Sequence, residues 1–383
     1  MVVMDAVALT QKLVRIPGLS GEEGAVADAI EQTMRELGYR EVTRDAMGTV
    51  LGQIGPEDAE TCLLFDGHMD VVPVVGEWSV DPFGGEIRDG RLWGRGSTDM
   101  KGGLAAAICG VAAAAQRGEL KHQAAVSATV LEEVIEGAAL GAVMDRLDPR
   151  AVVICEPTSL DLKTAQKGRL EMLLTIHGKP SHAAYPERGV NAIDFAARAL
   201  RALDAMTPVR SDELGAGILV PTDIISDPHP SISMLPNSVT IRFDRRTLVG
   251  ENSEDILGAM RHALTTDNVT NFDLEITDSE VSTYTDETFE PLRWLPAWRL
   301  DRDHELVLGA MDAIRETGQE PHLGVFGFCT NGSESAGRRK VPTIGIGPGS
   351  EGDAHIIDES VDVGEVAAAA EIYSNLVTGM AGV

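Results

Sequence analysis

Cysteine is scarce in this sequence. The four cysteines are far apart, form no Cys-x-x-Cys pair and mostly lie in apolar runs. This distribution favours reduced, buried thiols in a cytoplasmic protein over disulfides or a thiolate zinc site. The four residues are Cys62, Cys109, Cys155 and Cys329.

Long hydrophobic runs are also missing. The longest run of small apolar residues, 104–115, is far shorter than the roughly 20 residues that cross a bilayer. Residues 1–5 have neither a basic start nor a cleavable apolar core, so we expect no signal peptide. The sequence therefore predicts a cytoplasmic protein with no membrane partner.

Positive charge is low relative to negative charge. The 383 residues include 32 Lys and Arg against 60 Asp and Glu, a net charge of −28. Such a surface repels phosphate backbones and anionic lipids, so we expect no nucleic-acid partner. The acidity fits solubility or a salty cytoplasm, and a sharper interpretation is that a few carboxylates hold cations. With 43% hydrophobic residues, the chain is too apolar to be disordered.

Several motifs of common enzyme classes are absent. The sequence has no Walker A loop and no Gly-x-Ser-x-Gly elbow, and His304-Glu305 lacks the second histidine of a His-Glu-x-x-His zinc site. Gly94-Arg95-Gly96 lacks the third glycine of a dinucleotide fingerprint. A nucleotide-binding enzyme is therefore a distant alternative.

Alternating apolar strands, turns and helices indicate an α/β fold with a mainly parallel sheet and flanking helices. The pattern changes near Gly168 to half-exposed strands, loops and two helices, which is typical of an α+β insertion, and it returns after Tyr284. We predict one α/β domain from residues 1–167 and 285–383, interrupted by an inserted α+β domain at 168–284.

Ligand-type side chains follow four of the predicted strands. Because ligands bind beyond the carboxyl ends of strands in open α/β sheets, these side chains are expected to converge. Singly, each has an ordinary explanation as a turn former or a solvated acid; jointly they favour a site. Imidazoles mixed with carboxylates suit zinc, manganese or cobalt, and they suffice for two ions bridged by one carboxylate. The residues are His68 and Asp70, Glu132 and Glu133, Glu156, His355, and Asp99 in a glycine-rich loop.

Five segments, in order along nearly the whole chain, resemble the M20 metallopeptidase family. That family includes acetylornithine deacetylases, succinyl-diaminopimelate desuccinylases, carboxypeptidases and aminoacylases. Residues 330–333 and 342–355 look most like its selenium-metabolism hydrolase or dipeptidase branch. The five segments are GHMDVVP at 67–73, GRGSTDMKGG at 94–103, EE at 132–133, CEPT at 155–158 and SHA at 181–183.

The resemblance implies a role for each metal-type residue. Asp99 would bridge two ions, zinc being expected and cobalt or manganese the alternatives. Glu132 would be the general base, and Asp70 would orient the imidazole ring of His68. The remaining ligands would be His68 and Glu156 for one ion and Glu133 and His355 for the other.

The resemblance also implies that the inserted domain is a lid and dimerisation domain of a homodimer. His182 would stabilise the oxyanion, in many members from the partner subunit. Arg245 would bind a substrate carboxylate, and Gly332 and Ser333 would line the substrate pocket. The chain departs from the family pattern at Ser233, where asparagine is usual. It also departs at 331–334, where the usual Gly-Gly-Thr/Ser-Asp loop reads Asn-Gly-Ser-Glu.

These roles predict a metallohydrolase that cleaves the amide bond of a dipeptide or small peptide bearing a free carboxylate. The alternative is an N-acyl-amino-acid deacylase that uses the same residues. A catalytically inactive metal-bearing binding protein is a more distant alternative, because an inert scaffold would not need Glu132 and Asp70.

Overall fold

The computed structural model describes residues 5–57, 59–278 and 280–379. It divides into two compact units. The larger unit contains Met1–Gln166, Glu280–Phe289 and Trp298–Val383, and the smaller contains Lys167–Ser279 and Glu290–Ala297. Within the described ranges, no helix has the length and apolar character needed to span a bilayer.

The larger unit is built on a nine-stranded sheet in the order β1-β2-β6-β3-β7-β20-β8-β18, with β19 also paired to β8. Its centre, β6-β3-β7-β20, is parallel, and antiparallel strands lie towards the edges. This arrangement confirms the predicted α/β class. The strands are β1 (Glu41–Arg44), β2 (Val50–Ile54), β3 (Thr61–His68), β6 (Gln123–Thr129), β7 (Ala151–Ile154), β8 (Leu162–Gln166), β18 (Trp298–Arg299), β19 (Leu323–Phe326) and β20 (Thr343–Gly345).

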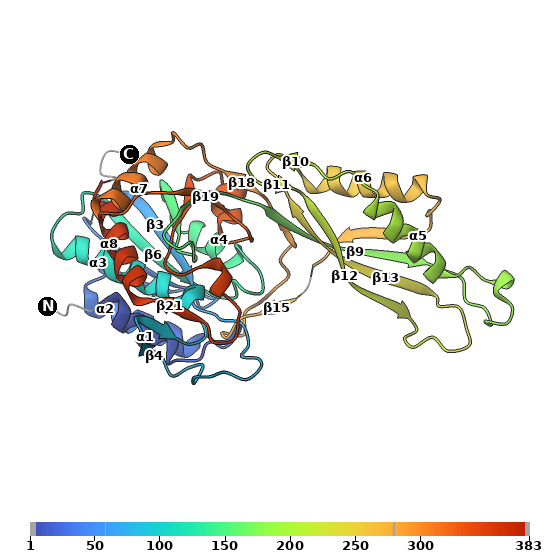
Figure 1. Ribbon diagram of the computed structural model, residues 1–383, viewed down its shortest axis with the longest axis horizontal. Coiled ribbons are helices and arrows are strands. Elements are labelled where there is room, and N and C mark those ends of the chain that lie inside the picture. The colour runs from blue at the N-terminus through green and yellow to red at the C-terminus, as the bar shows by residue number, and fades with distance from the viewer. Residues whose placement is uncertain (1–4, 58, 279, 380–383) are drawn as a thin grey trace. The chain divides into compact units, whose positions relative to one another are not determined.

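Helices cover both faces of this sheet. The alternation along β3 sends Leu63 and Phe65 into one core and Leu64 into another, because successive strand side chains point to opposite faces. The first core is closed by five helices, among which α3 and α8 lie side by side (Figure 1). Helix α4 (Ala138–Met144) closes the second. The five helices are α1 (Ala6–Val14), α2 (Gly24–Leu37), α3 (Gly102–Gln116), α7 (Glu305–Glu316) and α8 (Val363–Gly379).

The remaining elements of the larger unit are short. Strands β4, β5 and β21 form a small antiparallel sheet, and β15 pairs with β16. The glycine-rich loop becomes a short helical segment, η1, directly before α3. These elements are β4 (Glu86–Arg88), β5 (Arg91–Trp93), η1 (Ser97–Lys101), β15 (Val281–Ser282), β16 (Thr288–Phe289), η3 (Ser333–Arg338), η4 (Glu351–Asp353) and β21 (Ser360–Asp362).

The smaller unit is a five-stranded antiparallel sheet in the order β12-β13-β9-β14, with β17 also paired to β9. Helices α5 and α6 pack on one face (Figure 1), where strand residues such as Leu174 and Ile241 meet Leu203 and Met260. The elements are β9 (Gly168–His177), η2 (Pro186–Arg188), α5 (Ala192–Asp204), β10 (Arg210–Ser211), β11 (Gly215–Ala216), β12 (Ile218–Asp227), β13 (Ser238–Thr247), α6 (Ser253–Thr266), β14 (Phe272–Ile276) and β17 (Trp294–Leu295).

The observed unit boundaries differ from the predicted domain boundaries where the chain returns from the smaller unit to the larger one. Residues 285–383 were expected to belong together, yet Glu290–Ala297 lies in the smaller unit. The reason is β17, in which Trp294 and Leu295 pair with Leu170 and Arg169 of β9. A two-residue strand has no periodicity of its own, so the sequence did not reveal this crossing.

Candidate metal centre

The parallel strands bring the predicted ligands to one edge of the sheet in the larger unit. His68 is the last residue of β3. Glu132 and Glu133 follow β6, Glu156 follows β7, and His355 follows β20. Since β6, β3, β7 and β20 are neighbours, their carboxyl ends place these side chains together, as expected for an open α/β sheet.

Asp99 lies at the centre of this cluster. Its Oδ1 is 3.0 Å from Nε2 of His68, and its Oδ2 is 3.1 Å from Nε2 of His355. Asp99 leaves the helical conformation of η1, with φ −118° and ψ 96°. One carboxylate therefore faces two different imidazoles with its two oxygens.

Three glutamates complete the cluster on either side of Asp99. Glu133 Oε2 lies 3.0 Å from Nε2 of His355. Nε2 of His68 lies 3.7 Å from Oε1 of Glu156 and 4.0 Å from Oε2 of Glu132. Ligand atoms lie within 4.8 Å of one another in the set His68, Asp99 and Glu133 and in the set His68, Glu132 and Glu156.

The electrostatics of the cluster show a shortage of positive charge. Burial, together with the charge of Glu156, raises the pKa of Glu132 well above its usual 4.5. Burial and the charge of Asp99 raise the pKa of Glu156 and Glu133 as well. Hydrogen bonds to Asp99 and Glu133 raise the pKa of His355 from 6.5 to about 10. Each of these shifts favours the protonated form, which lowers the net negative charge of the cluster as bound divalent cations would.

Two carboxylate oxygens in the cluster have no polar partner among the described residues. Oε1 of Glu132 and Oε2 of Glu156 are both fully shielded from solvent. An unpaired buried acceptor is costly, and coordination to a cation would satisfy it. The imidazole and carboxylate donors fit a pair of divalent ions of the zinc, manganese or cobalt type.

Asp70 lies directly behind the cluster and is fully buried. Nδ1 of His68 is 2.8 Å from the main-chain oxygen of Asp70 and 3.6 Å from its Oδ1. The carboxylate itself accepts the main-chain N–H groups of Glu132 at 3.1 Å and Glu133 at 3.2 Å, and the hydroxyl of Ser20 at 2.8 Å. Asp70 thus contacts the ring through its main chain and holds the Glu132–Glu133 turn through its side chain.

The comparisons with known proteins agree with this arrangement. Residues 64–379 match the sequence profile of "Peptidase family M20/M25/M40". The chain belongs to this peptidase family. It is 30% identical over 378 residues to the protein YgeY of Escherichia coli K12, covering 97% of this chain and 93% of that protein.

A second curated relative and a solved structure of the same fold extend the comparison. A succinyl-diaminopimelate desuccinylase of Cereibacter sphaeroides (strain ATCC 17025 / ATH 2.4.3) is 33% identical over 268 residues, covering 63% of this chain and 69% of the enzyme. The crystal structure of aminopeptidase PepT from Bacillus cereus ATCC 10987 has a TM-score of 0.78 at 21% identity, covering 98% of both chains. As a member of the M20 family, the chain is a hydrolase of amide bonds.

His182 and Arg245 belong to the smaller unit. His182 is exposed in the loop after β9, and its Nδ1 accepts the N–H of Ala184 at 3.0 Å. Arg245 shares a face of β13 with Ile241 and Phe243. Its Nη2 lies 2.5 Å from Oε1 of Glu251. The predicted roles of both residues towards substrate stay predictions.

Gly332 and Ser333 are buried in the larger unit. The hydroxyl of Ser333 accepts a hydrogen bond from the side chain of Gln166 at 2.8 Å, and a methyl group at Gly332 would collide with the indole of Trp298. Their predicted contact with substrate stays a prediction. The adjacent Asn331, to which the sequence analysis assigned no role, donates from its side-chain amide to Oδ2 of Asp66 at 2.8 Å.

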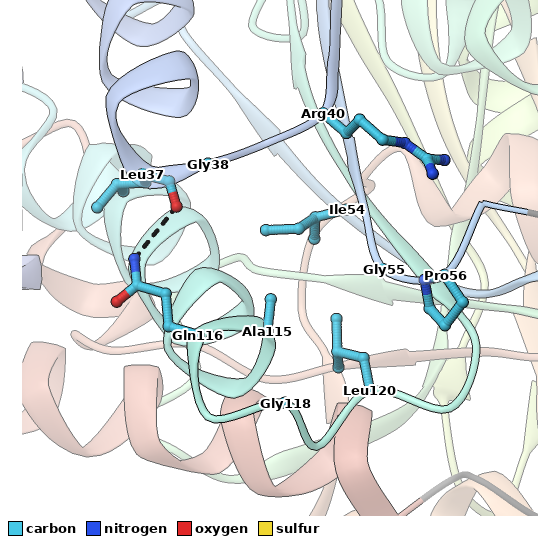
Figure 2. A pocket seen from close by; sticks show the side chains of 10 residues that line it. All are labelled: Leu37, Gly38, Arg40, Ile54, Gly55, Pro56, Ala115, Gln116, Gly118 and Leu120. Carbon is cyan, nitrogen blue, oxygen red and sulfur yellow. Dashed lines mark hydrogen bonds between the residues drawn. The ribbon is translucent and has the colours of Figure 1, made fainter. Parts of the chain in front are cut away.

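The larger unit also has a cavity of about 500 Å³ that is separate from the cluster (Figure 2). The C-terminus of α2, the end of α3 and the end of β2 line it. At one side of it, Nε2 of Gln116 donates to the main-chain oxygen of Leu37. No predicted site residue lines this cavity, and Arg40 is the charged residue among its described lining. The candidate site is therefore the strand-end cluster.

Proposed function

We propose that the cluster binds two divalent metal ions and that the chain hydrolyses the amide bond of a dipeptide or small peptide bearing a free carboxylate. One observation carries this proposal: the two oxygens of Asp99 lie 3.0 and 3.1 Å from the imidazoles of His68 and His355. A carboxylate flanked in this way divides the ligands into two sets that share it.

The proposed ligand sets are those that the family resemblance implies, and the distances around each imidazole are compatible with them. His68, Asp99 and Glu156 would hold one ion, and Asp99, Glu133 and His355 the other. Zinc suits three protein ligands with an open position, with cobalt or manganese as alternatives. The chemistry that such ions supply is polarisation of the scissile carbonyl and acidification of a water molecule to a pKa of about 7.

Glu132 is the proposed general base. It adjoins the ligand Glu133 but diverges from it, and its Oε1 has no polar partner among the described residues. That oxygen would take the proton of the attacking water and then pass it to the leaving nitrogen.

His182 is the proposed oxyanion donor, in keeping with the family resemblance. Because its Nδ1 accepts from the N–H of Ala184, the neutral ring carries its proton on Nε2. Nε2 is therefore the atom that can donate to a developing negative oxygen. Mixed dimers of His182→Ala and Glu132→Gln chains show on which subunit this ring acts. They regain activity if His182 acts on the partner subunit, and they stay inactive if it acts on its own subunit.

Glu132→Gln tests the mechanism, and Glu133→Gln is the matched comparison. The first change removes the proposed base but no proposed ligand, so two ions should remain bound while turnover falls by at least about 100-fold. The second removes a ligand, so metal content should fall as well. Metal analysis beside kcat measures both, and near-normal turnover of Glu132→Gln would contradict the assignment.

The second candidate function is N-acyl-amino-acid deacylation, which the similarity to a desuccinylase over 268 residues favours. A panel of dipeptides and of N-acetyl and N-succinyl amino acids, assayed with the zinc-loaded protein, separates the two. We expect the highest kcat/KM on dipeptides. Higher values on N-succinyl or N-acetyl substrates would transfer the assignment to the deacylase.

We also propose that the chain forms a homodimer through the smaller unit. Strand β12 is an edge of its sheet, pairing with β13 alone among the described residues. It exposes large apolar side chains at Ile218, Val220, Ile224 and Ile225, and an open apolar edge of this kind favours pairing with another chain. Light scattering should give twice the chain mass, and the mass of a single chain would contradict the dimer.

A further inference from the structure

Glu359 is a buried carboxylate outside the proposed ligand set. It has no exposed surface, and it immediately precedes β21. Its Oε1 accepts the main-chain N–H groups of Thr98 at 2.9 Å and of Asp99 at 3.1 Å. One side-chain oxygen therefore holds the two peptide groups on either side of Thr98, namely Ser97–Thr98 and Thr98–Asp99.

The other side-chain oxygen of Glu359, Oε2, is hydrogen-bonded as well. Oε2 accepts a hydrogen bond from NH1 of Arg95 at 2.6 Å, and the Glu359 main-chain oxygen accepts the N–H of Gly94 at 2.9 Å. Arg95 is only 1% exposed, and its guanidinium lies 5.1 Å from the ring centroid of Trp78. Glu359 thus holds both ends of the loop that carries Asp99. It binds the beginning of the loop through Gly94 and Arg95, and the end through the N–H groups of Thr98 and Asp99.

Glu359 also connects two of the proposed ligands, Asp99 and His355. His355 lies four residues before Glu359 in the chain, and its imidazole meets Asp99 at 3.1 Å. Anchoring position 359 on the Asp99 loop therefore fixes the end of the His355 loop as well. Ligands that share two ions must be held to about 0.5 Å, and hydrogen bonds from outside the ligand set are the usual means.

We propose that Glu359 is a positioning residue, which holds Asp99 in the orientation that lets one carboxylate serve both ions. This inference rests on the proposed function, because it presupposes a pair of ions at the cluster. A purely structural role for the Glu359–Arg95 ion pair would stabilise the loop without affecting how tightly metal binds. The two roles differ in measurable quantities.

Glu359→Gln is the test, and Asp358→Asn is the matched control. Glutamine has the same shape, but its NH2 group must face either Arg95 or the N–H groups of Thr98 and Asp99, which are all donors. Asparagine at 358 keeps the oxygen that accepts the N–H of Ser79 at 2.8 Å. Metal affinity is measured by competition with a chelator, and the geometry of the site by the visible spectrum of the cobalt(II)-loaded protein.

For Glu359→Gln we expect an apparent Kd for metal about 10- to 100-fold higher, an altered cobalt(II) spectrum, and activity that excess metal partly restores. Asp358→Asn should match the unsubstituted protein in all three. An unchanged Kd and spectrum in Glu359→Gln would overturn the proposal, even if its unfolding temperature fell.

A second variant keeps the test decisive if Glu359→Gln does not fold. Glu359→Asp retains the negative charge opposite Arg95 but is one methylene shorter, so it cannot bind Arg95 and both N–H groups together. It should show the same loss of metal affinity, and normal affinity would refute the positioning role. If the unsubstituted chain bound no pair of metal ions, the proposed function would fail and this inference with it. If the unsubstituted chain bound two ions and the variants bound them with equal affinity, this inference alone would be overturned.

Discussion

Asp70→Asn tests how the buried carboxylate behind the cluster contributes to the reaction. In the structure, Oδ1 accepts the N–H of Glu132 and Oδ2 accepts the N–H of Glu133 and the hydroxyl of Ser20. The ring of His68 is bound instead by the main-chain oxygen of Asp70, at 2.8 Å. The substitution therefore removes support from the Glu132–Glu133 turn and leaves the contact with the ring in place.

The size of the effect follows from these contacts. Asparagine keeps one oxygen and replaces the other by an NH2 group, so one N–H of the turn loses its acceptor. An unsatisfied buried donor costs about 1–3 kcal/mol, which corresponds to roughly 5- to 150-fold in rate if the turn is needed in the transition state. We expect kcat to fall within this range. Ser20→Ala, which removes one hydroxyl from Oδ2, should cost about 1 kcal/mol or less.

Steady-state kinetics and metal analysis of both variants measure this prediction. Asp70→Asn should keep the ion held by His68, Asp99 and Glu156 while kcat falls. An unchanged kcat would refute the supporting role of the carboxylate. Loss of that ion would show that the carboxylate, and not the main chain, orients the ring of His68.

Further predictions concern packing and pH. A methyl group at Gly110 of α3 would collide with the main-chain oxygen of Ala370 in α8, so Gly110→Ala should lower the free energy of unfolding by about 1–3 kcal/mol. A methyl group at Gly258 of α6 would meet no neighbouring atom within 4 Å, so Gly258→Ala should raise the free energy of unfolding by about 0.5–1 kcal/mol. Denaturant titrations that gave the same change for both variants would contradict this packing. Burial and the charge of Asp70 raise the pKa of Glu23 from 4.5 to about 7, so the folded chain holds this proton more tightly and loses stability as pH rises from 4.5 to 7. Glu23→Gln should remove up to about 3 kcal/mol of that loss, and parallel pH profiles of the metal-free proteins would refute the shift.

The fold class and the convergence of the candidate ligands could be predicted because both follow from local pattern. Apolar runs such as 151–154 end in a single acid or imidazole, and parallel strands place their carboxyl ends together. His68 and Glu156 are far apart in the sequence, yet they follow from this rule. Two adjacent glutamates at a strand end point different ways, which allows one to bind metal and the other to face a water molecule. The resemblance to the M20 family added the assignment of Glu132 as the proposed base and Glu133 as the proposed ligand.

The supporting residues could not be predicted in the same way. Glu23 accepts the N–H of Leu131 at 3.1 Å, and Glu359 accepts those of Thr98 and Asp99. Each is a single acid whose partner is a main-chain group in a distant part of the chain, and such a pair leaves no periodicity or motif. The side-chain role of Asp70 was hidden for the same reason, because its partners are main-chain groups.

The most direct test of the account is anomalous diffraction from crystals of the zinc-loaded protein. We predict two metal peaks, each about 2.0–2.2 Å from a different oxygen of Asp99, with His68 near one and His355 near the other. A single peak, or two peaks of which one does not contact Asp99, would contradict the central claim that one carboxylate joins two ions.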